Sequence, residues 1–259
     1  MGKKINPRVF RLGMSESWRS RWFASKDYAE LLQQDIKIRK FLTKELREAS
    51  IDRIEIERSR GEIIINISAA KPGVIIGRGG SSVEDIKQKV RRGFLEKNTK
   101  LQINITEVSV PNLSANVIVQ NIREDLEKRM PFRRVMKMNI EKVMKVGAKG
   151  VKIIVAGRLN GAEIARTEKL TQGKIPLQTI RSSIDYSRGI AQTIYGVIGI
   201  KVWIYKGEHF DKKAKEKEAV KEPQKTFKLF NKEKAVSLDS LVKQTAKAHK
   251  PKTTKKVSK

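Results

Sequence analysis

A glycine-rich loop that follows a short apolar stretch constrains this chain more than any other feature of its sequence. The segment reads Lys71-Pro72-Gly73-Val74-Ile75-Ile76-Gly77-Arg78-Gly79-Gly80-Ser81-Ser82. Gly77 and Gly80 have no Cβ, so they can adopt positive φ and allow a phosphate to approach the main chain closely. Arg78 adds a full positive charge, and Ser81 with Glu84 has the spacing of a capping box at the start of a helix. Because helix N-termini attract phosphate, the segment predicts a contact with nucleic-acid backbone.

Two other glycine-loop chemistries do not fit this segment. The dinucleotide fingerprint Gly-x-Gly-x-x-Gly is not met at Gly77–Gly80, and no Gly-Lys-Ser/Thr follows to complete a Walker loop. The four-residue Gly-x-x-Gly pattern is common on its own. Its meaning therefore depends on the order of the elements around it.

Hydrophobic periodicity predicts those elements. Apolar residues at spacings of three, four and seven indicate a helix, and β-branched or alternating runs indicate strands. In order, they are a helix over 27–49, strands over 51–58 and 62–68, helices over 72–76 and 82–96, and a strand over 101–108. The order αββααβ resembles the prokaryotic-type KH domain, whose Gly-x-x-Gly loop clamps about four backbone nucleotides.

The second half of the chain predicts a separate α+β domain. Ser114 can cap a helix that runs to Met130, and Pro131 then breaks it. After Gly150 the period changes to two. The predicted elements are helices over 114–130 and 132–146, strands over 151–157, 180–186 and 198–205, and a hairpin arm over 167–175. We expect helices on one face of a mixed sheet.

Three cations converge on one side of the helix predicted over 132–146. Arg134 and Lys137 are three residues apart, and Arg133 and Lys137 are four apart. Met136, Ile140 and Val143 form a separate apolar stripe. Clustered cations repel one another unless an anion lies against them, so the patch is interpreted either as an anion contact or as a solvated basic face.

The charge of the chain indicates a polyanionic partner. Lys and Arg total 57 against 28 Asp and Glu, a net charge of +29 with a pI near 10.3. Solubility does not require such an excess, and nucleic acid explains it. An anionic membrane surface is the rival partner, but no apolar run approaches the roughly 18 residues of a spanning helix.

Catalytic and metal chemistry have little support in the sequence. The chain has no cysteine and two histidines, His209 and His249, which argues against a His-dependent triad or a His-rich metal site. Glu124, Asp125 and Glu127 lie on a predicted helix among basic residues and are interpreted as solvated ion-pairing partners. We expect no catalytic residue, no metal and no cofactor.

Basic segments flank the two predicted domains. In the N-terminal arm, Trp18 and Trp22 lie beside Arg19 and Arg21, an arrangement that suits either stacking on RNA or packing on the first domain. The last 49 residues hold 16 lysines, no arginine and 6 acidic residues, which is typical of a disordered arm. The expected organisation is a basic arm over 1–26, a KH domain over 27–110, an α+β domain over 111–210 and a Lys-rich tail over 211–259.

Several further motifs make the sequence similar to a known family. It resembles bacterial-type ribosomal protein S-three of the small subunit, over about residues 1–208. The motifs that carry the resemblance are Met1–Pro7 with Arg11-Leu12-Gly13, Pro72–Gly80, Phe132–Lys137, Gly157–Arg166 and Tyr195–Trp203. Each motif is unspecific alone, and together they are highly specific.

The resemblance implies a two-domain rRNA-binding protein of the small-subunit head, in the cytoplasm or an organelle, placed where mRNA enters. It implies contact with rRNA, with mRNA and with ribosomal proteins S-ten, S-fourteen, S-four and S-five, and assistance in mRNA unwinding. The residues expected at RNA are Lys71, Gly77, Arg78, Gly79, Gly80, Arg133, Arg134, Lys137, Arg158 and Arg166. The clamp loop departs from the family, since relatives often carry two basic residues between the glycines and Gly79 stands at the second position.

Two other functions remain open on the sequence alone. A free-standing KH regulator of mRNA would share the clamp loop but would need neither the second domain nor the basic N-terminal arm. A nuclease or lyase acting on damaged DNA would need a lysine nucleophile, and no single lysine stands out.

Overall fold

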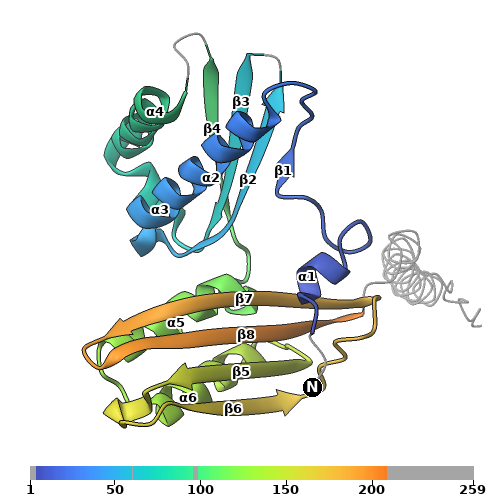
Figure 1. Cartoon of the computed structure of the whole chain (residues 1–259), viewed down its shortest axis with the longest axis vertical. Helices are drawn as coiled ribbons and strands as arrows, with labels where there is room; N and C mark the ends of the chain where they lie inside the picture. Colours follow the sequence, from blue (N-terminus) through green and yellow to red (C-terminus); the bar gives the residue numbers. More distant parts are fainter. Residues whose placement is uncertain (1–3, 60, 96–98, 209–259) are drawn as a thin grey trace, which may run out of the picture. The chain divides into compact units, whose positions relative to one another are not determined.

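The structure is a computed structural model that describes residues 4–59, 61–95 and 99–208. Within these ranges the chain forms two four-stranded sheets, each with helices and with its own hydrophobic core (Figure 1). The Lys-rich segment over 211–259, His209 and His249 lie outside the described residues. The domain boundaries placed at 26/27 and 110/111 stay predictions.

The first sheet has the spatial order β1-β2-β3-β4. Its strands are β1 (Ser20–Arg21), β2 (Ile51–Ser59), β3 (Glu62–Ala69) and β4 (Lys100–Glu107). Strands β2 and β3 pair antiparallel, whereas β1 pairs parallel to β2 and β4 pairs parallel to β3. Alternate isoleucines of β3 are buried, so one face of the strand contributes to the core.

The helices of the first half follow the predicted order. They are α2 (Tyr28–Glu45), α3 (Pro72–Ile76) and α4 (Ser81–Phe94), with short 3₁₀ turns at Arg47–Ala49 and Arg78–Gly80. Ile38 and Leu42 on α2 are fully buried and pack with Ile86 and Val90 of α4 in one core. The αββααβ order is therefore confirmed, with β1 as an additional strand from the N-terminal arm.

The second sheet has the order β6-β5-β8-β7 and is antiparallel throughout. Its strands are β5 (Gly150–Gly157), β6 (Arg166–Gly173), β7 (Ser182–Thr193) and β8 (Gly196–Glu208). The expectation of a mixed sheet was wrong in this respect. Parallel neighbours need a long crossover, but no α-helix separates these strands, and β7 and β8 are joined by two residues, Ile194 and Tyr195.

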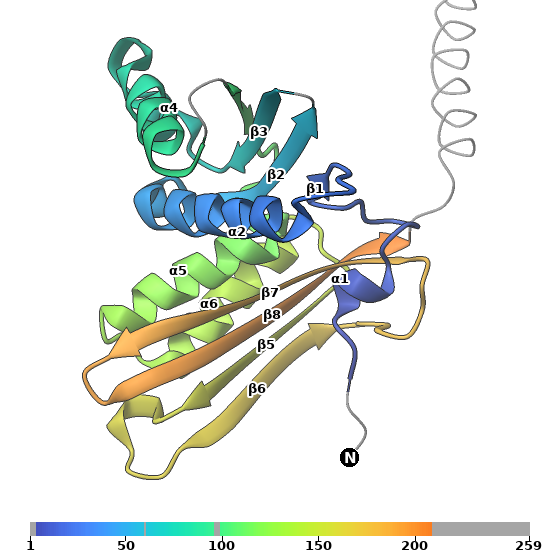
Figure 2. The same ribbon diagram turned by 45° about the horizontal axis from the view of Figure 1, so that its top comes forward.

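Helices α5 (Ala115–Glu127) and α6 (Phe132–Lys145) cover one face of this sheet (Figure 2). The Ser114 hydroxyl accepts a hydrogen bond from the Val117 amide at 3.4 Å, so the predicted cap is present. Met136, Ile140 and Val143 are buried, as the apolar stripe predicted.

The N-terminal arm contributes α1 (Pro7–Phe10) and a buried arginine that the sequence did not reveal. The Arg11 guanidinium donates hydrogen bonds of 2.6 to 3.3 Å to five backbone carbonyls, those of Pro7, Pro176, Leu177, Thr179 and Ser182. Burial lowers the pKa of Arg11 below its usual value. The arm is thus fixed to the segment that leads into β7.

The two tryptophans of the arm have different surroundings. The Trp22 indole donates to the Asp35 carboxylate at 2.9 Å, and its ring lies 5.2 Å from that of Tyr28. Trp22 therefore packs on the first half of the chain. Trp18 is 66% exposed and keeps the stacking interpretation open.

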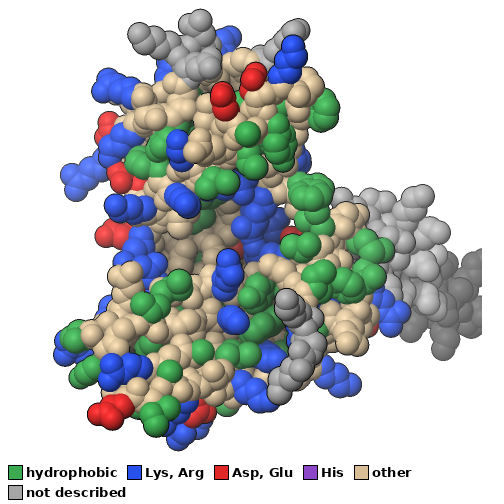
Figure 3. Space-filling view, in the orientation of Figure 1, with side chains coloured by type: hydrophobic (Ala, Val, Ile, Leu, Met, Phe, Trp, Pro, Cys, Tyr) green, Lys and Arg blue, Asp and Glu red, His purple; other side chains and the backbone are tan. Residues whose placement is uncertain are grey.

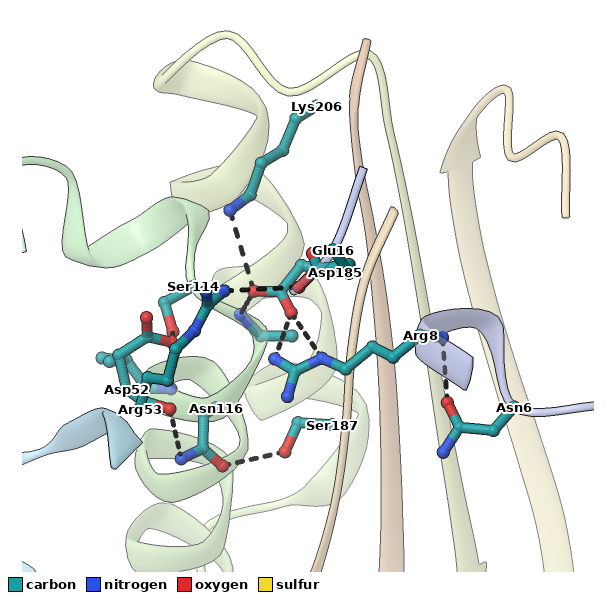
Figure 4. Close-up of polar contacts among 12 residues, drawn as sticks. Asn6, Arg8, Glu16, Asp52, Arg53, Ser114, Asn116, Asp185, Ser187 and Lys206 are labelled. Carbon is teal, nitrogen blue, oxygen red and sulfur yellow. Dashed lines mark hydrogen bonds and ion pairs between the residues drawn. The ribbon is translucent and has the colours of Figure 1, made fainter. Parts of the chain in front are cut away.

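A polar network links the arm, the start of α5 and both sheets (Figure 4). Asp185 on β7 accepts from Arg8 and from the Ala115 amide. The Asn116 side chain donates to the carbonyls of Ile51 and Asp52 and accepts from Ser187 at 2.9 Å. These contacts satisfy polar groups that the packing removes from water.

Candidate nucleic-acid interface

The glycine loop has the backbone conformation that its sequence predicts. Gly77, Gly79 and Gly80 have φ values of 69°, 62° and 83°, in the region that favours glycine. A Cβ on Gly77 would lie 2.7 Å from the Cβ of Ser82, whereas positions 79 and 80 face open space. Gly77 is therefore needed for packing, and Gly79 and Gly80 leave the main chain open to a ligand.

The predicted capping box is absent. Gly80, in the left-handed conformation, precedes α4, and Ser81 is the first helical residue. The Ser81 hydroxyl donates to the Arg78 carbonyl at 3.1 Å instead of accepting from the helix. No side chain among the described residues caps α4. The first-turn amides of α4 thus point towards the exposed loop, as an anion site requires.

The loop also has basic and apolar neighbours. Arg78 is exposed, and Lys71 is exposed where it precedes α3. Val74 and Ile76 on α3 are 48% and 43% exposed although they belong to an apolar run. Exposed apolar side chains beside a phosphate-binding loop can contact bases while the main chain holds the backbone.

Arg133, Arg134 and Lys137 lie together on α6. All three are exposed, and with Met138 and Glu141 they line a shallow hollow of about 440 Å³. Phe132, Val135 and Met136 on the same helix are buried. The apolar face therefore fixes the helix against the sheet and leaves the cations towards solvent.

The guanidinium groups of Arg133 and Arg166 both lie near the ring of Phe132. Their guanidinium carbons lie 5.7 Å and 5.8 Å from the centre of the Phe132 ring, and both arginines approach the Glu168 carboxylate, at 3.5 Å and 3.7 Å. Arg166 on β6 thus extends the patch of α6 (Arg133, Arg134 and Lys137). Glu168 offsets part of its charge.

Arg158 has structural partners. Its guanidinium donates to the carbonyls of Ala162 at 2.9 Å and Tyr195 at 3.3 Å, and so links the loop after β5 to the β7–β8 turn. Its role at RNA stays a prediction.

Comparison with known proteins identifies the family to which both halves of the chain belong. The sequence matches a KH domain family model over residues 37–113 and the C-terminal domain of ribosomal protein S3 over residues 122–204. The small ribosomal subunit protein uS3 of Desulfitobacterium hafniense is 48% identical over 210 residues, which cover 80% of this chain and 94% of the relative. The chain belongs to the uS3 family of small ribosomal subunit proteins. The family resemblance that the motifs indicated is thus confirmed.

Two further uS3 proteins show the same extent of similarity. The protein of Lawsonia intracellularis is 47% identical over 212 residues, covering 82% of this chain and 98% of the relative. That of Staphylococcus aureus strain Mu3 is 48% identical over 208 residues, covering 80% and 94%. The glycine loop lies within the KH match, and the α6 patch, Arg158 and Arg166 lie within the S3 match.

These uS3 relatives are named as ribosomal proteins and not as enzymes. Among the described residues, no group of three or more His, Cys, Asp or Glu side chains is placed to hold a metal ion. No helix in the same part of the chain is both long enough and apolar enough to cross a membrane.

Proposed function

We propose that this uS3 protein binds rRNA through the glycine loop at 77–80 and contacts incoming mRNA through Arg133, Arg134 and Lys137. The protein acts as a structural part of the small subunit of a cytoplasmic ribosome and performs no catalytic step. Its remaining neighbours are other proteins of the subunit head and of the mRNA entrance. Family membership over both sheets supports this function over a free-standing KH regulator, which would not need the second sheet.

The observation that carries the mRNA contact is the division of α6 into two faces. Its apolar face is buried against the sheet, and its three cations project into solvent from less than two turns of helix. Close cations raise one another's energy in the free protein. A phosphate backbone lying against them removes that cost, so the patch favours a polyanion.

The physical mechanism follows from charge and width. The three cations are spaced to hold the phosphates of one RNA strand. A base-paired duplex is wider than a single strand, so it binds less well at the same position. Movement of the ribosome along the message supplies the work of unwinding. The patch therefore needs only to bind, and it does not need to catalyse a reaction.

The test is the translation of structured messages. Ribosomes that carry Ala at positions 133, 134 and 137 should assemble, because the buried face of α6 is unchanged. They should elongate nearly normally on an unstructured message and more slowly than wild type on one with a stable hairpin. The measured quantity is the ratio of the two elongation rates.

The matched control is Lys142→Ala with Lys145→Ala, which removes two exposed cations from the last turn of the same helix. Its ratio should equal that of the wild type. If the triple variant also has the wild-type ratio, the α6 patch is a solvated basic face and the proposal for mRNA is wrong.

A further inference from the structure

The second sheet has a face that α5 and α6 do not cover. Lys152, Lys201 and Trp203 point to this face, because Ile153, Val202 and Ile204 between and beside them are buried against the helices. Figure 3 shows Lys and Arg side chains beside hydrophobic ones over these strands. The face combines positive charge with aromatic surface, and neither the glycine loop nor the α6 patch belongs to it.

One row across this face consists mainly of cations. Arg188 on β7 is the direct partner of Lys201 on β8, Lys201 is opposite Ile154 on β5, and Ile154 is opposite Lys169 on β6. Like charges directly opposite one another destabilise an antiparallel pair. No carboxylate forms an ion pair with Arg188 or Lys201 in the described part of the chain, so the protein itself does not offset this repulsion.

The neighbouring row is aromatic. Tyr186 is opposite Trp203, their ring centres are 5.1 Å apart, and Lys152 lies 5.2 Å above the Trp203 ring. Both rings are partly exposed. In one common RNA-binding module, a four-stranded sheet exposes aromatic rings on its open face and stacks two or three bases of single-stranded RNA on them.

The two rows form the floor of a hollow. It has a volume of about 750 Å³, and the N-terminal segment from Lys4 to Pro7 and the loop at Leu177 and Gln178 form its walls. Its charged lining residues are Lys4, Lys152, Arg188 and Lys201, and no acidic side chain of the described residues lines it. These surroundings favour a ligand that combines negative charge with flat apolar groups, and unpaired RNA has phosphates and exposed bases.

We propose that this open face binds unpaired nucleotides of RNA, with bases stacked on Tyr186 and Trp203 and phosphates held by Arg188 and Lys201. Lys152 and Lys4 add charge beside the bases. Base–aromatic stacking tolerates any sequence, so the site recognises a single strand and does not select particular bases. It is a third RNA contact in addition to the two in the proposed function.

The experiment isolates this face in the full chain. The starting protein carries Gly79→Asp and Ala at positions 133, 134 and 137, so the other two sites are weakened equally in every variant and the differences among variants report this face. The probe is fluorescein-labelled oligoadenylate, and a perfectly paired RNA duplex is the comparison. Three variants are made in this protein: Tyr186→Leu with Trp203→Leu, Tyr186→Phe with Trp203→Phe, and Arg188→Gln with Lys201→Gln.

The Leu pair should weaken oligoadenylate binding by at least about fivefold per base unstacked and leave its salt dependence unchanged. The Phe pair keeps the rings and should retain most of the affinity. The Gln pair should reduce the slope of log affinity against log salt by about 1.4, because two phosphate contacts are lost. Duplex binding should change little in the aromatic variants.

Thermal unfolding provides a second readout. The Gln pair removes the opposed charges of Arg188 and Lys201, so its unfolding midpoint should rise while its RNA affinity falls. A purely structural role for these residues predicts the opposite change in stability. This variant also keeps the proposal testable if the Leu pair fails to fold.

If both the Leu and the Gln variants bind oligoadenylate as tightly as the starting protein, the proposal is wrong. Loss of binding to a polyglutamate peptide in these variants with RNA binding unchanged would also overturn it, because the face would then recognise an acidic protein segment.

Discussion

Arg8 in the N-terminal arm forms an ion pair with Asp185 on β7, 177 positions later in the chain. The same carboxylate accepts the Ala115 amide at 2.9 Å and lies 3.8 Å from the Lys206 ammonium (Figure 4). Burial alone would raise the pKa of Asp185, but Arg8 and Lys206 together hold it below its usual value of 3.8. The contact therefore depends on an ionised carboxylate.

Replacing Asp185 with Asn should destabilise the protein by about 3–5 kcal/mol, because Arg8 then stays largely buried without its counter-charge. The folded-state pKa of Asp185 is depressed, so its contribution is present above the unfolded-state pKa and is lost as the pH falls through the folded-state value. The stability difference between wild type and variant should be constant near neutral pH and shrink below about pH 4. Urea unfolding at a series of pH values measures it.

The control for this substitution is Asp27→Asn, an exposed residue at positive φ, where Asn is equally well tolerated. It should change the free energy of unfolding by less than about 0.5 kcal/mol. A difference for Asp185→Asn that does not vary with pH would show that the carboxylate acts through shape alone.

Replacing Arg11 with Met should cost at least about 3 kcal/mol of stability, because five backbone carbonyls lose their donor. Arg11→Lys should not restore the loss, since an ammonium has three donors and lacks the planar fork that reaches these acceptors. Arg19→Met, at an exposed position of the same arm, is the matched control. Urea unfolding midpoints compare the three, and a stable Arg11→Lys variant would contradict the role assigned to the guanidinium geometry.

The glycine loop allows a substitution pair that differs in charge alone. Gly79 has φ 62° and ψ 17° and open space at its Cβ position, and both Asn and Asp adopt this conformation. Gly79→Asp should weaken rRNA binding by about tenfold, equivalent to about 1.4 kcal/mol, and Gly79→Asn should bind nearly as wild type. Gly77→Ala should weaken binding and also destabilise α4, because its Cβ would collide with Ser82. Filter binding with an rRNA fragment measures these affinities. If the Gly79→Asp and Gly79→Asn variants bind the fragment equally well, the loop does not contact rRNA.

Removing the carboxylate of Glu168, which lies on β6 beside the α6 patch, should strengthen RNA binding. Glu168 lies within 4 Å of both Arg133 and Arg166, and Glu168→Gln frees both guanidinium groups. The affinity for single-stranded RNA should rise, and the slope of log affinity against log salt should steepen by about 0.7 for each additional phosphate held. Titrations over a series of salt concentrations measure both effects. An unchanged slope would show that the two arginines do not reach RNA.

Local patterns were sufficient to predict most elements of the fold. The stripe on α2, the alternation along β3 and the buried face of α6 result from periods of 3.6 and 2 that any amphipathic element must have. The cations of α6 were found for the same reason, because the spacing that buries Met136 and Ile140 exposes Arg133 and Arg134.

Features that depend on distant partners were not predictable in this way. Arg11 resembles any other basic residue of the arm, and its burial depends on carbonyls more than 160 positions away. The predicted capping box was wrong for a local reason. Gly80 occupies the N-cap position of α4, so Ser81 is the first residue of the helix and cannot act as its cap. The uncovered aromatic row was missed because Tyr186 and Trp203 meet only through the register of β7 and β8.

The carbonyl contacts of Arg11 have a consequence for the order of biosynthesis. Arg11 is made near the start of translation, but the Ser182 carbonyl appears 171 residues later. At about 5–20 residues per second, the arm waits roughly 10 to 30 seconds for its acceptors. During that interval the first sheet can fold with β1 of the arm, but Arg11 cannot reach the carbonyls at positions 176–182. The first residues to be synthesised are thus among the last to reach their final position.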